Sequence, residues 1–112
     1  MSEEKILIED FAKLELRVGK ILGVEDHPNA NKLYVLKVDF NEEKPRQIIA
    51  GLKPFYKKED LLNKKAVFVV NLESANLRGL ESNGMILAAD NGAGKVIFLE
   101  PEKDIEIGSK IR

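Results

Sequence analysis

Residues 14–24 read LELRVGKILGV and predict a bent β-strand. From Leu14 to Val18 every second residue is apolar and the residues between them are charged, which is the period of a strand with one buried face. The alternation breaks near Gly19 and Gly23, as expected where a strand bulges to follow a barrel. The stretch therefore predicts a curved sheet.

The sequence on either side supplies further strands. Residues 27–31 (HPNAN) predict a turn, because proline fixes φ and asparagine tolerates left-handed backbone. The turn should join the bent strand to a second one in a hairpin. A short helix is predicted within residues 8–13, and a short helix or an irregular crossover within 52–62. A long polar connection is predicted over 73–84 and a hairpin turn at 91–95 (NGAGK). Further strands are predicted at residues 33–40, 46–50, 66–72, 85–89 and 96–99.

Five core strands with a short helical insertion between the third and fourth are typical of an OB-fold, a five-stranded Greek-key barrel. We therefore predict one all-β domain over residues 1–112, with its core at about 14–90. A different small β-barrel fits the same pattern. An alternating βαβ chain does not, because only one internal segment suits a helix.

Composition excludes several kinds of site. The chain of 112 residues has no cysteine, so disulfides, thiolate zinc sites and cysteine nucleophiles are absent. Its single histidine, His27, cannot form a cluster of imidazole metal ligands. We expect no metal and no cofactor. No apolar run approaches the roughly 18 residues of a membrane span, and residues 1–8 do not resemble a signal peptide, so we expect a soluble cytoplasmic protein without a membrane partner.

Catalytic patterns are also missing from the sequence. Asp26-His27 could be half of a proton relay, but no serine lies in a glycine elbow and a turn proline follows, so we interpret His27 as a turn residue. Residues 91–95 lack the spacing and the final serine or threonine of a phosphate-binding loop. We therefore expect a protein that is not an enzyme.

Charge is unevenly distributed along the chain. The net charge is -1, yet residues 44–65 carry seven basic and two acidic side chains. Charge alone fits a solvated lysine-rich loop equally well. In OB-folds, however, the loops after the first and fourth strands frame a nucleic-acid face. Lys32 lies on the first such loop and Arg78 on the second, and Arg46, Lys53, Lys57 and Lys58 could extend a positive track beside them.

Several motifs together resemble the tRNA-binding domain family. That family comprises freestanding dimeric tRNA-binding proteins, C-terminal modules or β subunits of methionyl-tRNA synthetases, and CsaA-type export chaperones. Asn31 and Asn83 stand where the family usually has aspartate and glutamine. The matching stretches are residues 10–11 (DF), 16–21 (LRVGKI), 27–33 (HPNANKL), 47–52 (QIIAGL), 71–72 (NL) and 78–89 (RGLESNGMILAA).

The resemblance implies an OB-fold that binds tRNA by shape and performs no chemistry of its own. Carried onto this chain, it places Lys32, Arg78, Ser82 and Met85 on the binding face. Asn31, Arg46 and Lys53 complete the candidate set. We expect Lys32, Arg78 and Ser82 to lie outside the core, so that their substitution by alanine leaves thermal stability unchanged.

The resemblance also implies a homodimer built from the N-terminal helix and the strands after the barrel, here residues 6–13 and 95–112. The candidate interface residues are Phe11, Ile97, Leu99, Ile105, Ile107 and Ile111. Two functions remain open at this point. One is a tRNA binder acting as an accessory β subunit or trans-acting cofactor of a methionyl-tRNA synthetase. The other is a CsaA-like chaperone that holds extended polypeptide.

Overall fold

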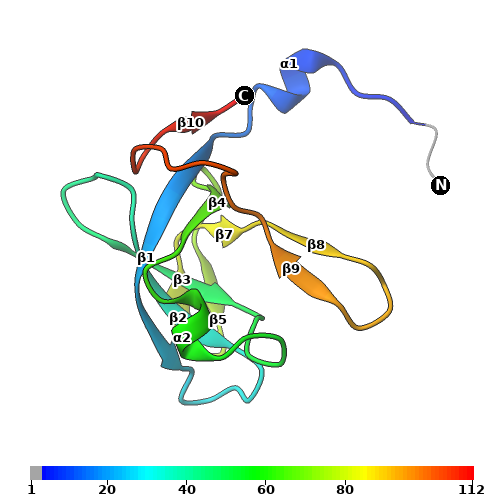
Figure 1. The fold of residues 1–112 in the computed structure, drawn as a ribbon. Coiled ribbons are helices and arrows are strands. Elements are labelled where there is room, and N and C mark those ends of the chain that lie inside the picture. Colours follow the sequence, from blue (N-terminus) through cyan, green and yellow to red (C-terminus); the bar gives the residue numbers. More distant parts are fainter. Residues whose placement is uncertain (1–3) are drawn as a thin grey trace.

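The computed structural model describes residues 4–112 and builds them around one strongly bent antiparallel sheet (Figure 1). Residues 1–3 of the expected domain lie outside the described residues. The strand order is β3-β2-β1-β4-β7, and β10 (Lys110–Ile111) pairs with the start of β1. The strands of this order are β1 (Leu16–Asp26), β2 (Tyr34–Asp39), β3 (Arg46–Ala50), β4 (Lys65–Val69) and β7 (Met85–Ile86).

Strand β1 bends where the glycines predicted it. Its first half pairs with β4, its second half pairs with β2, and the register shifts between Ile21 and Gly23. Gly19 leaves room for the ring of Phe40, since a Cβ atom there would lie 2.5 Å from Cε1 of Phe40. Because β1 pairs with β4 before the bend and with β2 after it, this one strand belongs to both halves of the barrel.

The barrel closes between β3 and the chain that follows the fourth strand. The amide of Asn83 donates to the carbonyl of Gln47 at 2.9 Å, and the amide of Ile49 donates to the hydroxyl of Ser82 at 2.9 Å. Inside, the rings of Phe40 and Phe68 meet edge to face, with centroids 5.2 Å apart. The largest fully buried side chains are Phe68, Ile21, Leu36, Ile48, Leu61, Val18 and Val38. The predicted all-β, OB-like barrel is confirmed.

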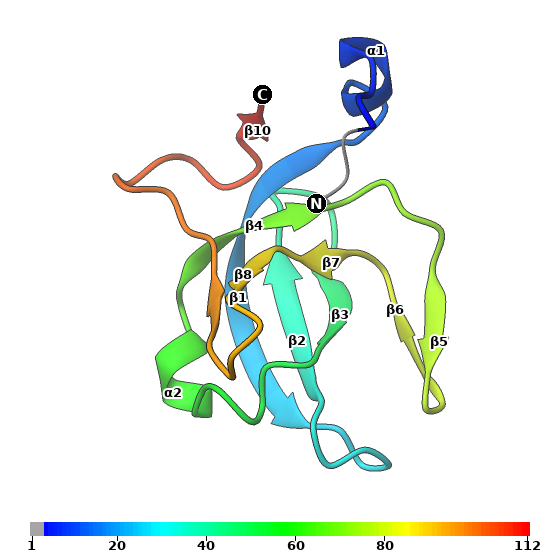
Figure 2. The same cartoon turned by 90° about the vertical axis from the view of Figure 1, so that its right-hand side faces the viewer.

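Two short helices and two hairpins complete the described chain. Helix α1 (Ile8–Phe11) precedes the barrel, and α2 (Lys58–Leu61) lies between β3 and β4, as predicted. The turn at residues 91–95 joins β8 (Ala88–Asp90) to β9 (Val96–Phe98), which confirms that hairpin. The other hairpin, β5 (Ala75–Leu77) with β6 (Leu80–Ser82), projects from the side of the barrel in Figure 2.

The structure corrects three details of the prediction. The segment 73–84, expected as a long polar connection, contains a β-hairpin. The expected strand at 85–89 is divided into β7, which extends the sheet, and β8, which pairs with β9. Within residues 95–112, expected to form strands of a dimer interface, β9 pairs with β8 and β10 pairs with β1 of the same chain. Short strands such as these bury few side chains, so their periodicity in the sequence is weak.

Candidate nucleic-acid interface

One end of the barrel brings together three of the predicted binding residues. The loop between β1 and β2 and the turn of the β5–β6 hairpin line a hollow of about 400 Å³. Its lining residues are Ala30, Asn31, Lys32, Leu33 and Arg78. Figure 2 shows this loop and the hairpin at the lower end of the molecule, far from α1. Two segments that are almost fifty residues apart in sequence thus form one surface.

His27 holds these two segments together. The side chain is 4% exposed, and its Nδ1 accepts the amide of Asn29 at 3.0 Å. Since Nδ1 is the acceptor, Nε2 carries the proton and donates to the carbonyl of Leu77 at 2.9 Å. Leu77 is the residue before Arg78, so His27 fixes the hairpin against the loop that carries Lys32. The sequence identified His27 as a turn residue but gave no signal of this contact with the hairpin.

Arg78 occupies a backbone conformation that suits other residues better. The two-residue turn Arg78-Gly79 has φ values of 57° and 97°, so it is a type I′ turn, in which asparagine or glycine is preferred at the first position. A left-handed conformation costs an arginine roughly 1 kcal/mol. The amide of Gly79 donates to Oδ1 of Asn76 at 3.0 Å, which supports the turn. Backbone preference therefore does not explain the arginine, whereas a functional side chain at the hairpin tip does.

Lys32 and Arg78 are also free of internal ion pairs. Within residues 4–112 neither forms a salt bridge, and both are exposed. Lys53 differs, because its Nζ lies 3.0 Å from Asp26, which also binds Lys58 at 3.1 Å. The hydrogen bond from Lys53, followed by the one from Lys58, lowers the pKa of Asp26 below its ordinary value. Lys32 and Arg78, unlike Lys53, are thus available to an anionic ligand.

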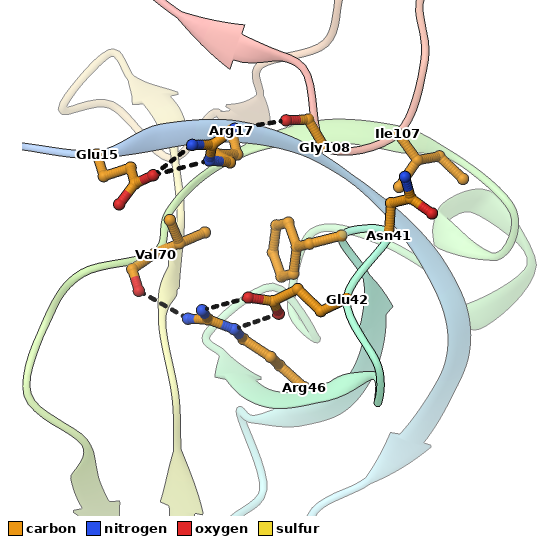
Figure 3. Close-up of a pocket in the computed structure, with 9 residues that line it drawn as sticks. Glu15, Arg17, Asn41, Glu42, Arg46, Val70, Ile107 and Gly108 are labelled. Atoms are coloured by element: carbon orange, nitrogen blue, oxygen red, sulfur yellow. Dashed lines mark hydrogen bonds and ion pairs between the residues drawn. The ribbon is translucent and has the colours of Figure 1, made fainter.

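Arg46 lies at the opposite end of β3 from this hollow. It lines a second hollow of about 370 Å³, in which its guanidinium binds Glu42 and the carbonyl of Val70 (Figure 3). Its hydrogen bond lowers the pKa of Glu42. Across the same hollow, Arg17 binds Glu15 and the carbonyl of Gly108. Both arginines are neutralised by carboxylates, so this hollow differs in chemistry from the one at Arg78.

Ser82 departs from the expected surface position. It is 4% exposed, its hydroxyl accepts the amide of Ile49, and it donates to the carbonyl of Gly84 at 3.1 Å. With its hydroxyl used on both sides, Ser82 links β3 to β6. Met85 is 47% exposed on β7, outside the hollow that Arg78 lines. The predicted set is therefore divided over several surfaces.

The residues predicted for the dimer interface differ in their exposure. Phe11, Ile97, Leu99 and Ile105 are exposed, whereas Ile107 and Ile111 are half-buried. Ile107 lines the hollow of Arg46, and Ile111 pairs with Leu16 of β1. Two of the three isoleucines expected at the dimer interface, Ile107 and Ile111, are thus already partly covered by their own chain.

The amide of Asn71 anchors the segment after α1. Its Oδ1 accepts the amide of Glu15 at 2.7 Å, and its Nδ2 donates to the carbonyl of Lys13 at 2.7 Å. No residue of α1 is buried. The short helix is therefore fixed at its base and presents an apolar surface outward.

Two kinds of feature are missing from the part of the chain that the structure describes. No group of three or more aspartate, glutamate or histidine side chains in residues 4–112 is arranged to hold a metal ion. Over the same residues, no helix has both the length and the apolar character that crossing a membrane requires.

A family model described as a putative tRNA binding domain matches residues 16–110. The chain belongs to this family. The tRNA-binding domain is 56% identical over 109 residues to a methionine--tRNA ligase of Pyrococcus horikoshii, a match that covers 97% of this chain and 15% of the ligase. It is 49% identical over 119 residues to the enzyme of Methanosarcina acetivorans, covering 99% of the chain and 17% of that enzyme. The chain thus spans less than a fifth of these relatives.

Solved structures agree with this assignment. A MetRS related protein from Pyrococcus horikoshii superposes with a TM-score of 0.90 at 33% identity, covering 97% of this chain and 99% of that one. A CsaA chaperone protein from Picrophilus torridus superposes with a TM-score of 0.88 at 34% identity, covering 96% and 100%. The tRNA-binding domain is therefore related both to part of methionine--tRNA ligases and to CsaA-like proteins.

Proposed function

We propose that this tRNA-binding domain is a non-catalytic cytoplasmic module that binds folded tRNA as a homodimer and serves a methionyl-tRNA synthetase, as an accessory β subunit or a trans-acting cofactor. The observation that carries the proposal is the hollow that gathers Asn31, Lys32 and Arg78, because its two cations form no salt bridge with any carboxylate of residues 4–112.

The three side chains suit the backbone of an RNA. The Arg78 guanidinium can donate two parallel hydrogen bonds to phosphate oxygens, and Lys32 can act as a point charge beside it. The carboxamide of Asn31 can both donate to and accept from a ribose hydroxyl. Such contacts recognise the shape of a folded RNA and carry little sequence information.

A second copy of the chain would strengthen this binding. One hollow offers few phosphate contacts, and joining two copies raises avidity without new contacts per copy. The exposed apolar surface supports the proposal. Ile6 and Leu7 directly before α1, and Ile8 at its start, are 66–74% exposed, and Phe11 at the end of α1 is 38% exposed. Contact with a second copy would remove these side chains from water.

The synthetase partner is proposed from the relatives. The matched methionine--tRNA ligases carry a domain of this kind within a longer chain. A separate copy would supply the same tRNA contacts from outside the enzyme. The alternative is a CsaA-like function in which the exposed apolar surface holds extended polypeptide, and the superposition on the CsaA chaperone of Picrophilus torridus favours it.

Filter binding of a tRNA transcript over a salt series tests the proposal. The affinity should fall with salt, and Lys32→Ala should reduce the slope by about one. Sedimentation of the same sample should give the mass of a dimer. Capture of bound molecules from the native cell extract separates the two functions: tRNA together with a synthetase supports the first, and preprotein peptides without tRNA contradict it.

A further inference from the structure

The segment after β3 lies at the same end of the barrel as the hollow of Arg78. Residues 51–57 cross this end toward α2, close to the loop between β1 and β2 (Figure 2). They line a separate hollow of about 420 Å³. Its lining residues are Tyr34, Lys53, Pro54, Phe55, Tyr56, Lys57 and Asp60. In the sequence, only the lysines of this segment were candidate binding residues.

Phe55 is an exposed ring on a rigid turn. Its side chain is 41% exposed, and its amide donates to the carbonyl of Leu52, which is buried, at 2.9 Å. On the other side Tyr56 packs against the core, with its ring 5.2 Å from that of Phe98. The hydroxyl of Tyr34 donates to the carbonyl of Tyr56 at 2.7 Å. The turn is thus anchored on both sides of Phe55, so its ring is held in place at little cost in entropy on binding.

The charges around Phe55 suit a base better than a phosphate inside the hollow. Lys53 is engaged by Asp26, and the Asp60 carboxylate lines the hollow and accepts the amide of Lys57 at 3.3 Å. A carboxylate repels phosphate, but it can accept a hydrogen bond from the amino group of a base. The ammonium of Lys57 forms no ion pair within residues 4–112 and is exposed at the rim. It can therefore contact the phosphate next to such a base.

Two consecutive residues at the start of β2 line the two hollows. Leu33 lines the hollow of Arg78, and the next residue, Tyr34, lines that of Phe55. Asp26, which binds Lys53 and Lys58, directly precedes His27, the residue that holds the hairpin. An RNA strand whose phosphates lie at Lys32 and Arg78 would thus have Phe55 within reach of a neighbouring nucleotide.

We propose that Phe55 is a stacking platform for an unpaired nucleobase of the bound tRNA, with Lys57 on the adjacent phosphate. This inference rests on the proposed function, because it extends the same tRNA-binding face. Aromatic side chains hold unstacked bases in this way in single-stranded regions of RNA. Lys32 and Arg78 would then bind the phosphate backbone of the tRNA. Phe55 would bind only a nucleotide whose base is unpaired and can leave its helix.

The chain contains no tryptophan, so Phe55→Trp introduces a single fluorescent reporter at the platform. Adding a tRNA transcript should quench its fluorescence as a base stacks on the indole. The matched control is Leu62→Trp, since Leu62 is 42% exposed after α2 and does not line the hollow. That reporter should change little on adding the same transcript.

Affinity measurements complete the test. Phe55→Ala and Phe55→Leu should each weaken tRNA binding about five- to a hundredfold, the range for loss of one stacked base, whereas Phe55→Trp should bind as wild type does. None of the variants should alter binding to a fully paired RNA duplex. If Phe55→Ala and Phe55→Leu bind tRNA as wild type does while Arg78→Asn does not, the proposal that a base stacks on Phe55 is wrong and the proposed function stands. If the wild-type chain fails to bind tRNA, both are wrong.

Discussion

The Nε2 atom of His27 lies 2.9 Å from the carbonyl oxygen of Leu77, and this contact joins the two segments that carry Lys32 and Arg78. The other ring nitrogen accepts the amide of Asn29. One buried imidazole therefore sets the spacing between the two unpaired cations.

Removing the imidazole should affect both stability and tRNA binding. His27→Ala should lower the free energy of unfolding by about 1–3 kcal/mol, because two hydrogen bonds and the packing of a buried ring are lost. Glutamine can reproduce the donor at Nε2, and asparagine the acceptor at Nδ1. We therefore expect His27→Gln to retain more tRNA affinity than His27→Asn, as measured by filter binding alongside thermal melting. Equal tRNA affinity in His27→Ala and wild type would show that the contact with Leu77 does not position Arg78.

Ser82→Ala should destabilise the barrel, contrary to the expectation from the sequence. The hydroxyl of Ser82 accepts the amide of Ile49 in a buried position, and its removal leaves that donor unsatisfied. We expect a loss of about 1–3 kcal/mol in unfolding free energy, with unchanged tRNA affinity under conditions where the variant is folded. The control is Ser74→Ala, at an exposed position, which should match wild type in denaturant titrations. A Ser82→Ala protein as stable as wild type would show that the Ser82 hydroxyl does not stabilise the closed barrel.

Glu42 should give the protein part of its acid sensitivity. The hydrogen bond from Arg46 lowers the pKa of Glu42, so its stabilising contribution is fully present above the ordinary value of 4.5. That contribution is lost as pH falls through the lowered folded-state pKa. Glu42→Gln should therefore melt below wild type at pH 7, and the difference should shrink as the pH falls below 4.5 and through the lowered folded-state pKa. A difference in melting temperature that does not shrink anywhere below pH 4.5 would contradict this assignment.

Phe11→Glu should weaken the proposed homodimer without unfolding the barrel. Phe11 lies on α1, none of whose residues is buried within the chain, and a carboxylate there would oppose contact with a second copy. Sedimentation at several concentrations should show a monomer, while thermal melting detects an intact fold. Leu22→Glu is the control, because Leu22 is 41% exposed on β1, outside the proposed interface. Wild-type protein that sediments as a monomer at every concentration would contradict the dimer itself.

Local signals predicted the bent barrel well. The glycines of residues 14–24 indicated where β1 bends, HPNAN indicated the turn to β2, and NGAGK indicated the β8–β9 hairpin. Each signal depends on backbone preferences of a few adjacent residues, which a sequence displays directly.

Features that depend on distant partners were harder to predict. The β5–β6 hairpin escaped prediction because its turn starts with Arg78 where asparagine or glycine is usual. The burial of Ser82 depends on Ile49, thirty-three residues away, across the closing edge of the barrel. Likewise, the alternation of Ile107 and Ile111 predicted apolar contacts but not that their own chain would provide part of them.

The most direct test of the account is the affinity of Arg78→Asn for tRNA, measured beside its unfolding free energy. Asparagine is preferred at the left-handed first position of this turn, so the variant should be at least as stable as wild type. Its loss of a charge-assisted contact to phosphate should weaken tRNA binding about tenfold to a hundredfold. A stable Arg78→Asn protein that binds tRNA as tightly as wild type would contradict the placement of the tRNA-binding face at Arg78.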